Sequence, residues 1–137
     1  LLPFGIAKVK KEGSDITILT YGMMVQRSLE AARTMEEKGV SVEVVDLRTL
    51  NPLDYDTILK SAKKTGKVLC VHEENMFSGF GGELAAIVAS EAFEYLDGPI
   101  MRVAAKDSPV PYAPSIENDM LPQTQDILNA LEKLAAY

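Results

Sequence analysis

The order of hydrophobic and polar positions alternates between two periods along the chain. Short apolar or alternating runs rich in β-branched residues predict five strands, at residues 6–11, 15–21, 40–46, 67–71 and 99–104. Apolar residues spaced three or four positions apart predict helices around residues 25–35, 55–62, 84–95 and 127–134. Strands that alternate with helices through mostly short connections indicate a parallel or mostly parallel sheet layered by helices.

Capping residues and prolines mark where these elements end. Asp54 is a plausible N-cap, while Gly39 and Gly66 stand where C-terminal cap glycines belong. The segment 106–123 holds four prolines, so we expect an extended loop rather than a regular element. Long ordered loops in compact domains usually serve an interface or a site.

Composition narrows the possible partners. The 137 residues suit one domain, with 47% hydrophobic and 25% charged residues. A net charge of −6 and a pI near 4.8 argue against nucleic-acid or anionic-membrane binding, and favour a basic protein partner. A single cysteine, Cys70, excludes an internal disulfide and is consistent with a reducing compartment. No apolar run reaches the roughly 18 residues of a membrane span.

A glycine-rich stretch, residues 78–82, precedes the third helix. Backbone amides at such a helix start can bind phosphate, but the spacing fits neither the dinucleotide nor the P-loop motif. Glu73, Glu74 and Glu83 flank the stretch and would repel an anion. We therefore expect these glycines to permit close packing of the loop against the helix start.

His72 and Glu73 follow a predicted buried strand, at the edge where open α/β sheets usually bind ligands. His72 could act as a base or a metal ligand, but no second histidine or cysteine is present to complete a metal site. Cys70 alternates into the strand interior and is expected in the core. We favour a framework or interface role for His72 and Glu73 over direct catalysis.

Arg48 keeps two interpretations, whereas the acidic residues have one. Arg48 could clamp a carboxylate or phosphate, or form an ion pair with Asp46 or Asp54 at the strand-to-helix turn. The acidic residues Asp15, Glu91, Glu94 and Asp97 are by default a solvated face. The residues alone thus indicate an α/β domain of undefined activity.

Several segments together resemble the C-terminal, transketolase-like domain of β subunits in thiamine-diphosphate-dependent 2-oxo acid dehydrogenases. They are DLRTLNPLD (46–54), VHEENMFSGFGGELAA (71–86) and LDGPIMRVAAKDSPVPYAP (96–114). The resemblance covers essentially the whole chain in order. Lys106 and Ser78 depart from it, since proline and glycine respectively are commoner there.

The resemblance implies a three-layer α/β domain with a five-stranded, mostly parallel sheet and one antiparallel edge strand. Residues 1–14 would form the linker and edge strand, and residues 15–137 a single domain within a longer subunit. The family's thiamine diphosphate and Mg²⁺ lie between the α subunit and the β subunit's N-terminal domain. Neither motif that binds them is present here, so we expect no catalytic, cofactor or metal residues in this chain.

Assembly is the function that the resemblance implies. The expected partners are the α subunit, a second β subunit and the basic peripheral-subunit-binding domain of the acyltransferase, in the cytoplasm or the mitochondrial matrix. The residues assigned to subunit interfaces are Arg48, His72, Glu73, Phe77, Phe80 and Glu83. Those assigned to acyltransferase docking are Glu94, Asp97 and Tyr137.

Three alternatives stay open at this point. The chain could belong to transketolase or deoxyxylulose-phosphate synthase, or be a free-standing domain that binds a small anion near Arg48 and Gly79. The substrate is not encoded in this segment, although the spacing from His72 and Glu73 to Gly79 and Phe80 leans toward the branched-chain type over the pyruvate type.

Overall fold

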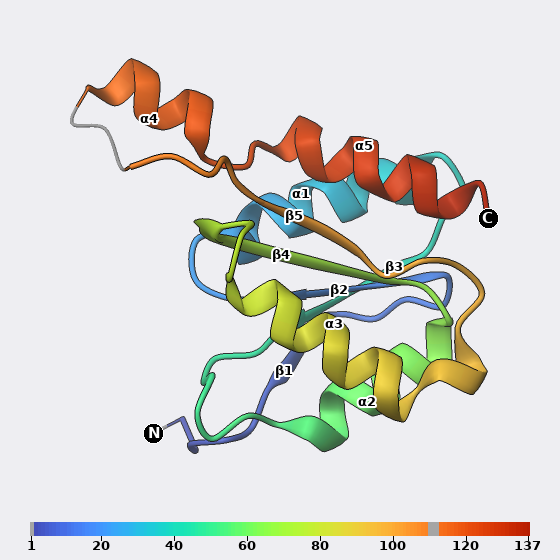
Figure 1. Ribbon diagram of the computed structural model, residues 1–137. Coiled ribbons are helices and arrows are strands. Elements are labelled where there is room, and N and C mark those ends of the chain that lie inside the picture. The colour runs from blue at the N-terminus through green and yellow to red at the C-terminus, as the bar shows by residue number, and fades with distance from the viewer. Residues whose placement is uncertain (1, 110–112) are drawn as a thin grey trace.

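The computed structural model describes residues 2–109 and 113–137, which form three layers (Figure 1). The strands are β1 (Lys8–Lys11), β2 (Ile16–Thr20), β3 (Val42–Asp46), β4 (Val68–Asn75) and β5 (Met101–Ala105). The helices are α1 (Met24–Glu37), α2 (Tyr55–Thr65), α3 (Phe80–Glu91), α4 (Pro114–Met120) and α5 (Thr124–Ala135), with a 3-10 turn, η1, at Phe93–Tyr95.

The five strands form one sheet in the order β1-β3-β2-β4-β5. β1 runs antiparallel to β3, with Lys8 opposite Asp46, and the other neighbours are parallel. Figure 1 shows α1 and α5 above the sheet, and α2 and α3 below it. This confirms the expected three-layer fold with one antiparallel edge strand.

Helices on both faces explain why the central strands are almost continuously apolar. Every residue of β2 is buried, because one hydrophobic core lies between the sheet and α1/α5 and a second between the sheet and α2/α3. Cys70 belongs to the second core, as expected, and burial raises the pKa of its thiol to about 12. It is therefore a packing residue and not a nucleophile.

The predicted helix ends are confirmed at α2. Asp54 accepts a hydrogen bond from the backbone of Thr57 at 3.0 Å, and Gly66 ends the helix at φ +74°. The backbone N–H of Gly66 donates to the carbonyl of Ala62, the arrangement of a left-handed C-terminal cap. Gly39 likewise follows α1 at φ +83°.

The expectation of an extended loop over residues 106–123 was wrong at Pro114–Met120, which forms α4. Proline disrupts a helix interior, but at the first helical position its missing N–H would have had no partner and its fixed φ already fits. Pro114 occupies this position. Residues 110–112 lie outside the described residues.

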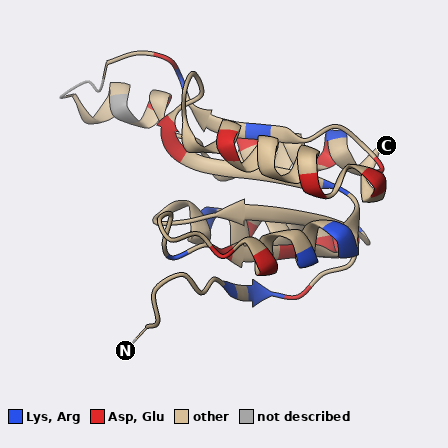
Figure 2. Cartoon of the chain, turned by 60° about the horizontal axis from the view of Figure 1, so that its bottom comes forward, with Lys and Arg blue, Asp and Glu red and all other residues tan. Residues whose placement is uncertain are grey.

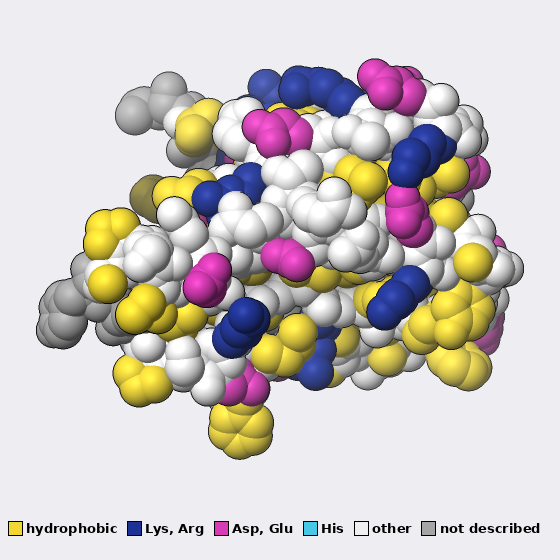
Figure 3. Space-filling model, turned by 90° about the horizontal axis from the view of Figure 1, so that it is seen from above, with side chains coloured by type: hydrophobic (Ala, Val, Ile, Leu, Met, Phe, Trp, Pro, Cys, Tyr) yellow, Lys and Arg dark blue, Asp and Glu magenta, His cyan; other side chains and the backbone are white. Residues whose placement is uncertain are grey.

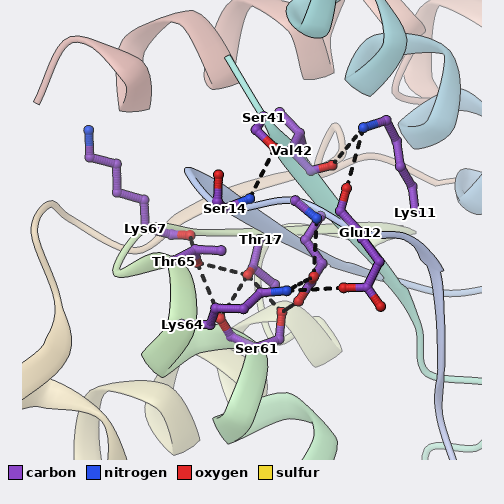
Figure 4. A network of polar contacts seen from close by, with 12 residues as sticks. Lys11, Glu12, Ser14, Thr17, Ser41, Val42, Ser61, Lys64, Thr65 and Lys67 are labelled. Atoms are coloured by element: carbon purple, nitrogen blue, oxygen red, sulfur yellow. Dashed lines mark hydrogen bonds and ion pairs between the residues drawn. The ribbon is translucent and has the colours of Figure 1, made fainter.

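A buried polar network ties β1, β2 and β3 to α2 (Figure 4). Glu43 is 1% exposed and accepts hydrogen bonds from Ser61 at 2.5 Å and from the Gly13 backbone at 3.2 Å. Lys64 forms an ion pair with the same carboxylate, and Thr17 lies 2.8 Å from the Ser61 hydroxyl. Burial alone would raise the pKa of Glu43, but these donors outweigh it and lower the pKa below its usual value.

Replacing Lys64 with methionine is expected to destabilise the domain by about 1–3 kcal/mol at pH 7, because it leaves a buried carboxylate without its cation. The estimate is at the low end for buried pairs, since the Lys64 side chain is 41% exposed. The lowered pKa of Glu43 gives stability that is present above pH ~4.5 and is lost as the pH falls through the folded-state value. Urea unfolding should therefore show that the difference in free energy of unfolding between the wild-type protein and Lys64→Met becomes smaller as the pH falls.

Lys60→Met is the matched control, because Lys60 is exposed on the same helix and has no ion-pair partner among the described residues. We expect it to change stability by less than about 0.5 kcal/mol. Equal effects of the two substitutions would contradict a specific role for the network.

Candidate functional site

The structure divides the sequence-predicted site residues between the two ends of the sheet. Those assigned to subunit interfaces lie at or beyond the carboxyl ends of β3 and β4, which is the left side of Figure 1. They are Arg48, His72, Glu73, Phe77, Phe80 and Glu83. Those assigned to docking, Glu94, Asp97 and Tyr137, lie at the opposite end, which we call the amino edge.

His72 is fully buried at the carboxyl edge, between the end of β2 and the start of α3. The Tyr21 ring stacks on its imidazole with centroids 6.4 Å apart and an angle of 13° between the planes. Phe80 in turn meets Tyr21 edge to face at 6.1 Å. Three rings from three elements therefore form a packed cluster in which His72 is innermost.

Glu74 completes this cluster and was not anticipated as part of it. The Tyr21 hydroxyl donates to its carboxylate at 2.6 Å, and a carboxylate oxygen of Glu74 lies 2.9 Å from Nδ1 of His72. That approach is too bent for a hydrogen bond, so neither imidazole nitrogen has a partner among the described residues. Tyr21 could have been noticed from the sequence, because it ends a predicted strand beside a glycine.

The environment holds His72 neutral. Burial lowers the pKa of its imidazole, and the nearby carboxylate of Glu74 only partly opposes that effect. Burial and the hydrogen bond to Glu74 raise the pKa of Tyr21 well above its ordinary value. A buried neutral imidazole suits packing better than proton transfer to a substrate, and the framework role of His72 stays a prediction.

The glycines at the start of α3 are explained by His72. A Cβ on Gly79 would lie 2.2 Å from the Asn75 carbonyl oxygen and 2.6 Å from Cε1 of His72, and a Cβ on Gly81 would lie 2.5 Å from Nε2 of His72. No side chain fits at either position while the imidazole is in place. The expectation that these glycines allow close packing is confirmed.

Ser78, where the family more often has glycine, adopts a left-handed conformation with φ +57°. Such a conformation favours glycine because it has no Cβ to clash with the backbone. The backbone conformation at residue 78 therefore explains why glycine is the commoner residue there.

Arg48 also has a left-handed backbone, with φ +62°, and its side chain is half-buried. The ion pair, one of the two interpretations of Arg48, is not formed: among the described residues, no carboxylate lies within 4 Å of its guanidinium. Asp46 instead accepts from the Arg48 backbone at 3.0 Å, and Asp54 accepts from Ala7 at 2.8 Å. Both carboxylates are thus used by the backbone, which leaves the guanidinium available to a partner.

Several large apolar side chains are exposed at the carboxyl edge. Phe77 is 80% exposed, and further large apolar residues with more than half of their surface exposed come from separate segments: Phe4, Met23 and Ile116. Hydrophobic side chains are visible at both ends of the molecule in Figure 3, and the left end is the carboxyl edge. Exposed large apolar side chains on several segments of one edge favour a protein interface there.

The amino edge holds the three residues assigned to docking. The backbone of Asp97 donates to the Gly66 carbonyl at 2.7 Å, so the end of α2 fixes this turn. Tyr137 is 69% exposed and packs against Gly98. A Cβ added to Gly98 would lie 3.3 Å from the Cβ of Tyr137. A hollow of about 510 Å³ beside it is lined by Pro99, Met101, Lys133, Ala136 and Tyr137.

Charge at the amino edge is mixed rather than purely acidic. Asp97 and Glu94 are exposed, but Lys63 stacks over the Tyr95 ring at 5.3 Å. Lys67 lines a second hollow together with Asp97. Any basic partner would therefore need to approach the carboxylates directly. Over residues 2–109 and 113–137, no group of three potential metal ligands is found, and no helix is long and apolar enough to cross a membrane.

Comparisons with known proteins agree with the resemblance. Residues 5–127 match the family model "Transketolase, C-terminal domain". The chain is 47% identical over 133 residues to the pyruvate dehydrogenase E1 component subunit beta of Rickettsia bellii, covering 97% of this chain and 41% of that protein. It is 44% identical over 134 residues to the mitochondrial counterpart of Dictyostelium discoideum, covering 98% and 38%. The chain therefore spans about two fifths of these relatives' length.

Two solved structures share the fold. "Split gene transketolase, inactive beta4 tetramer" superimposes with a TM-score of 0.84 and 28% identity, covering 98% of this chain and 43% of that one. A 2-oxoglutarate:ferredoxin oxidoreductase from Magnetococcus marinus gives a TM-score of 0.66 at 16% identity, covering 96% and 20%. The second likeness concerns the fold alone.

Gly81→Ala is expected to destabilise the domain by about 1–3 kcal/mol, because the added methyl group overlaps the buried imidazole. Gly82→Ala is the control: its nearest neighbour would be Arg102 at 3.6 Å, and alanine favours the helix. Thermal or urea unfolding should show a loss for the first variant and no loss for the second. His72→Ala should reduce the cost of Gly81→Ala, and independent, additive effects would argue against the contact.

Proposed function

Because the chain belongs to the transketolase C-terminal domain family, we propose that it is the assembly domain of the β subunit of a 2-oxo acid dehydrogenase, of the pyruvate type. The carboxyl edge is the observation that carries this proposal. It presents exposed apolar side chains and an unpaired guanidinium, while its only imidazole is buried and neutral. Such a surface suits a protein neighbour.

The parent enzyme decarboxylates a 2-oxo acid with thiamine diphosphate and transfers the acyl group to a lipoyl arm. The residues of this chain do not fit that cofactor. His72 fills the space beneath the glycines at the start of α3, and the exposed carboxylates of Glu73 and Glu83 flank it. We therefore place the cofactor and its Mg²⁺ outside this domain, and the same contacts disfavour a free-standing anion-binding domain.

The pyruvate type is favoured over the branched-chain type by the relatives, several of which are pyruvate dehydrogenase E1 β subunits. This similarity outweighs the spacing from His72 to Phe80, which favoured the branched-chain type. They include bacterial and mitochondrial proteins, which supports a cytoplasmic or mitochondrial-matrix location.

The two edges of the sheet are given different partners in this proposal. The carboxyl edge, with Arg48, Phe77 and Phe80, contacts the α subunit and the rest of the β subunits. The amino edge, with Glu94, Asp97 and Tyr137, docks the basic peripheral-subunit-binding domain of the acyltransferase. Because the two edges lie at opposite ends of the sheet, both contacts can form at once.

Transketolase is the second candidate, because a split-gene transketolase chain superimposes over 98% of this one. That protein is described as an inactive β4 tetramer, which supports an assembly role without activity for a chain of this fold. The intact α–β enzyme distinguishes the two candidates. Turnover of pyruvate with lipoyl acceptors supports the dehydrogenase, whereas turnover of carbohydrate phosphates supports transketolase.

Phe77→Ser in the intact β subunit is expected to weaken α–β association roughly 10- to 100-fold, because it removes an aromatic anchor from the interface. Phe93→Ser is the matched control, since Phe93 is 74% exposed but lies at the amino edge. Calorimetry of α with each β variant measures the effect. Unchanged affinity for the Phe77 variant would remove the carboxyl edge from the interface.

Asp97→Lys is expected to weaken binding of the acyltransferase domain, and more strongly at low salt, because the contact is electrostatic. Asp56→Lys makes the same charge change on an exposed residue of the first turn of α2, away from the amino edge. Titrations of the α–β assembly at two ionic strengths compare them. Equal losses for both variants would indicate only a net-charge effect.

A further inference from the structure

His72 is a titratable side chain that is enclosed without a hydrogen-bond partner. It is fully buried, and neither Nδ1 nor Nε2 of its ring is paired within the part of the chain that the structure describes. Buried polar atoms in folded proteins are nearly always paired, so an exception calls for an explanation. A framework role gives the ring a place in the packing, but packing alone does not require a titratable side chain there.

The two nitrogens of the ring face opposite kinds of charge. A carboxylate oxygen of Glu74 lies 2.9 Å from Nδ1, whereas Nε2 faces the start of α3, where a Cβ on Gly81 would lie 2.5 Å away. The backbone amides of a helix start carry partial positive charge. A proton on Nδ1 is therefore favourable, but a second proton on Nε2 would point at the positive end of the helix. The closed arrangement suits the neutral ring.

The titratable and charged groups around the ring come from four elements. They are Tyr21 after β2, Glu73 and Glu74 on β4, Arg102 on β5 and the exposed Glu83 in the first turn of α3. β2 has no charged residue and β4 has none before His72, and the inner strands are accordingly tan along most of their length in Figure 2. Burial lowers the pKa of the imidazole, Glu74 opposes this effect, and the positive charge of Arg102 adds to it.

The turn between β4 and α3 lies over this ring. From the side of β5, Arg102 donates to the Met76 carbonyl at 3.3 Å, and Asp107 accepts from the Phe77 backbone at 2.9 Å. From below, His72 fills the space that the glycines at the start of α3 leave open. Surface turns held by a few contacts open more readily than strands or helices of the core. Opening of this turn would give the imidazole access to water.

We propose that His72 is a pH-sensitive switch under the carboxyl edge: the neutral ring holds residues 76–82 in place, and uptake of a proton releases them. The pKa of His72 is lowered below its usual 6.5, so the closed form is fully stabilised above pH ~6.5 and loses stability as the pH falls below that value. The Glu43 network loses its contribution only below pH ~4.5, so the two effects fall in separate ranges. The inference deepens the proposed function, because the released residues include Phe77 of the interface assigned to α.

Hydrogen exchange of the full-length β subunit between pH 7.5 and 5.5, corrected for intrinsic rates, measures the release. Protection of the amides in residues 76–84 is expected to fall by about 3- to 10-fold between pH 6.5 and 5.5, since uptake of one proton changes an opening equilibrium by at most tenfold per pH unit. Their protection should also be lower than that of β2 and α5 at every pH. Protection that does not depend on pH, or that equals the protection of β2 and α5, overturns the proposal.

Two substitutions assign the effect to the ring. His72→Gln takes up no proton in this range, so exchange of residues 76–84 should no longer depend on pH. Glu74 is half-exposed, and Glu74→Gln removes the carboxylate that favours the protonated ring in the closed form. The loss of protection in that variant should be at least as large as in the wild type, and a smaller loss would contradict the switch.

Glu91→Gln makes the same charge change at the other end of α3 and should keep the wild-type profile. An unaltered pH dependence in His72→Gln would assign the titration to another group and overturn the proposal. Exchange in the β subunit alone does not involve α, so its outcome is independent of the Phe77 experiment, which tests the proposed function.

Discussion

The contact between a buried imidazole and two glycines determines what this domain offers to other molecules. Gly79 and Gly81 lie so close to His72 that neither position has room for a Cβ. A glycine-rich start of a helix is elsewhere a binding place for phosphate, but here the available space is occupied by the chain itself. The same packing fixes the start of α3, and thus the direction in which Phe77 and the following turn face solvent.

Parallel strand order determines the rest of the arrangement. All four parallel strands end at one edge of the sheet, so segments far apart in the sequence bring Arg48, His72 and Phe77 to the same side of the molecule. The turns that precede the strands, including Asp97, lie at the other edge. An assembly domain with two opposed surfaces can join subunits at one edge while a further partner binds at the other.

The fold could be predicted from the sequence because its signals were local and redundant. β-Branched runs, the Asp54 cap and Gly66 each marked their elements without help from distant residues. The site was predicted only in part. His72 and its glycines were identified, and Glu74 was named only as a flanking charge. Tyr21 joins them through the pairing of β2 with β4.

Glu43 illustrates the same limit. In the sequence it is one polar position in an alternating strand, yet it is buried because β1 and α2 cover it, and Lys64 is its partner from 21 residues away. Helix α4 was missed for a different reason: a proline was taken as a disruption although it begins the helix. Positional context, rather than residue type, decided both cases.

A calorimetric titration of thiamine diphosphate with Mg²⁺ into the 137-residue chain tests the central claim most directly, with the intact α–β enzyme as the positive control. The sample should first show a cooperative unfolding transition, so that the folded domain is the species titrated. We predict no saturable binding by the chain up to about 1 mM ligand, whereas the α–β enzyme binds. Saturable binding by the chain alone would contradict an assembly domain whose glycine-rich helix start is filled by His72.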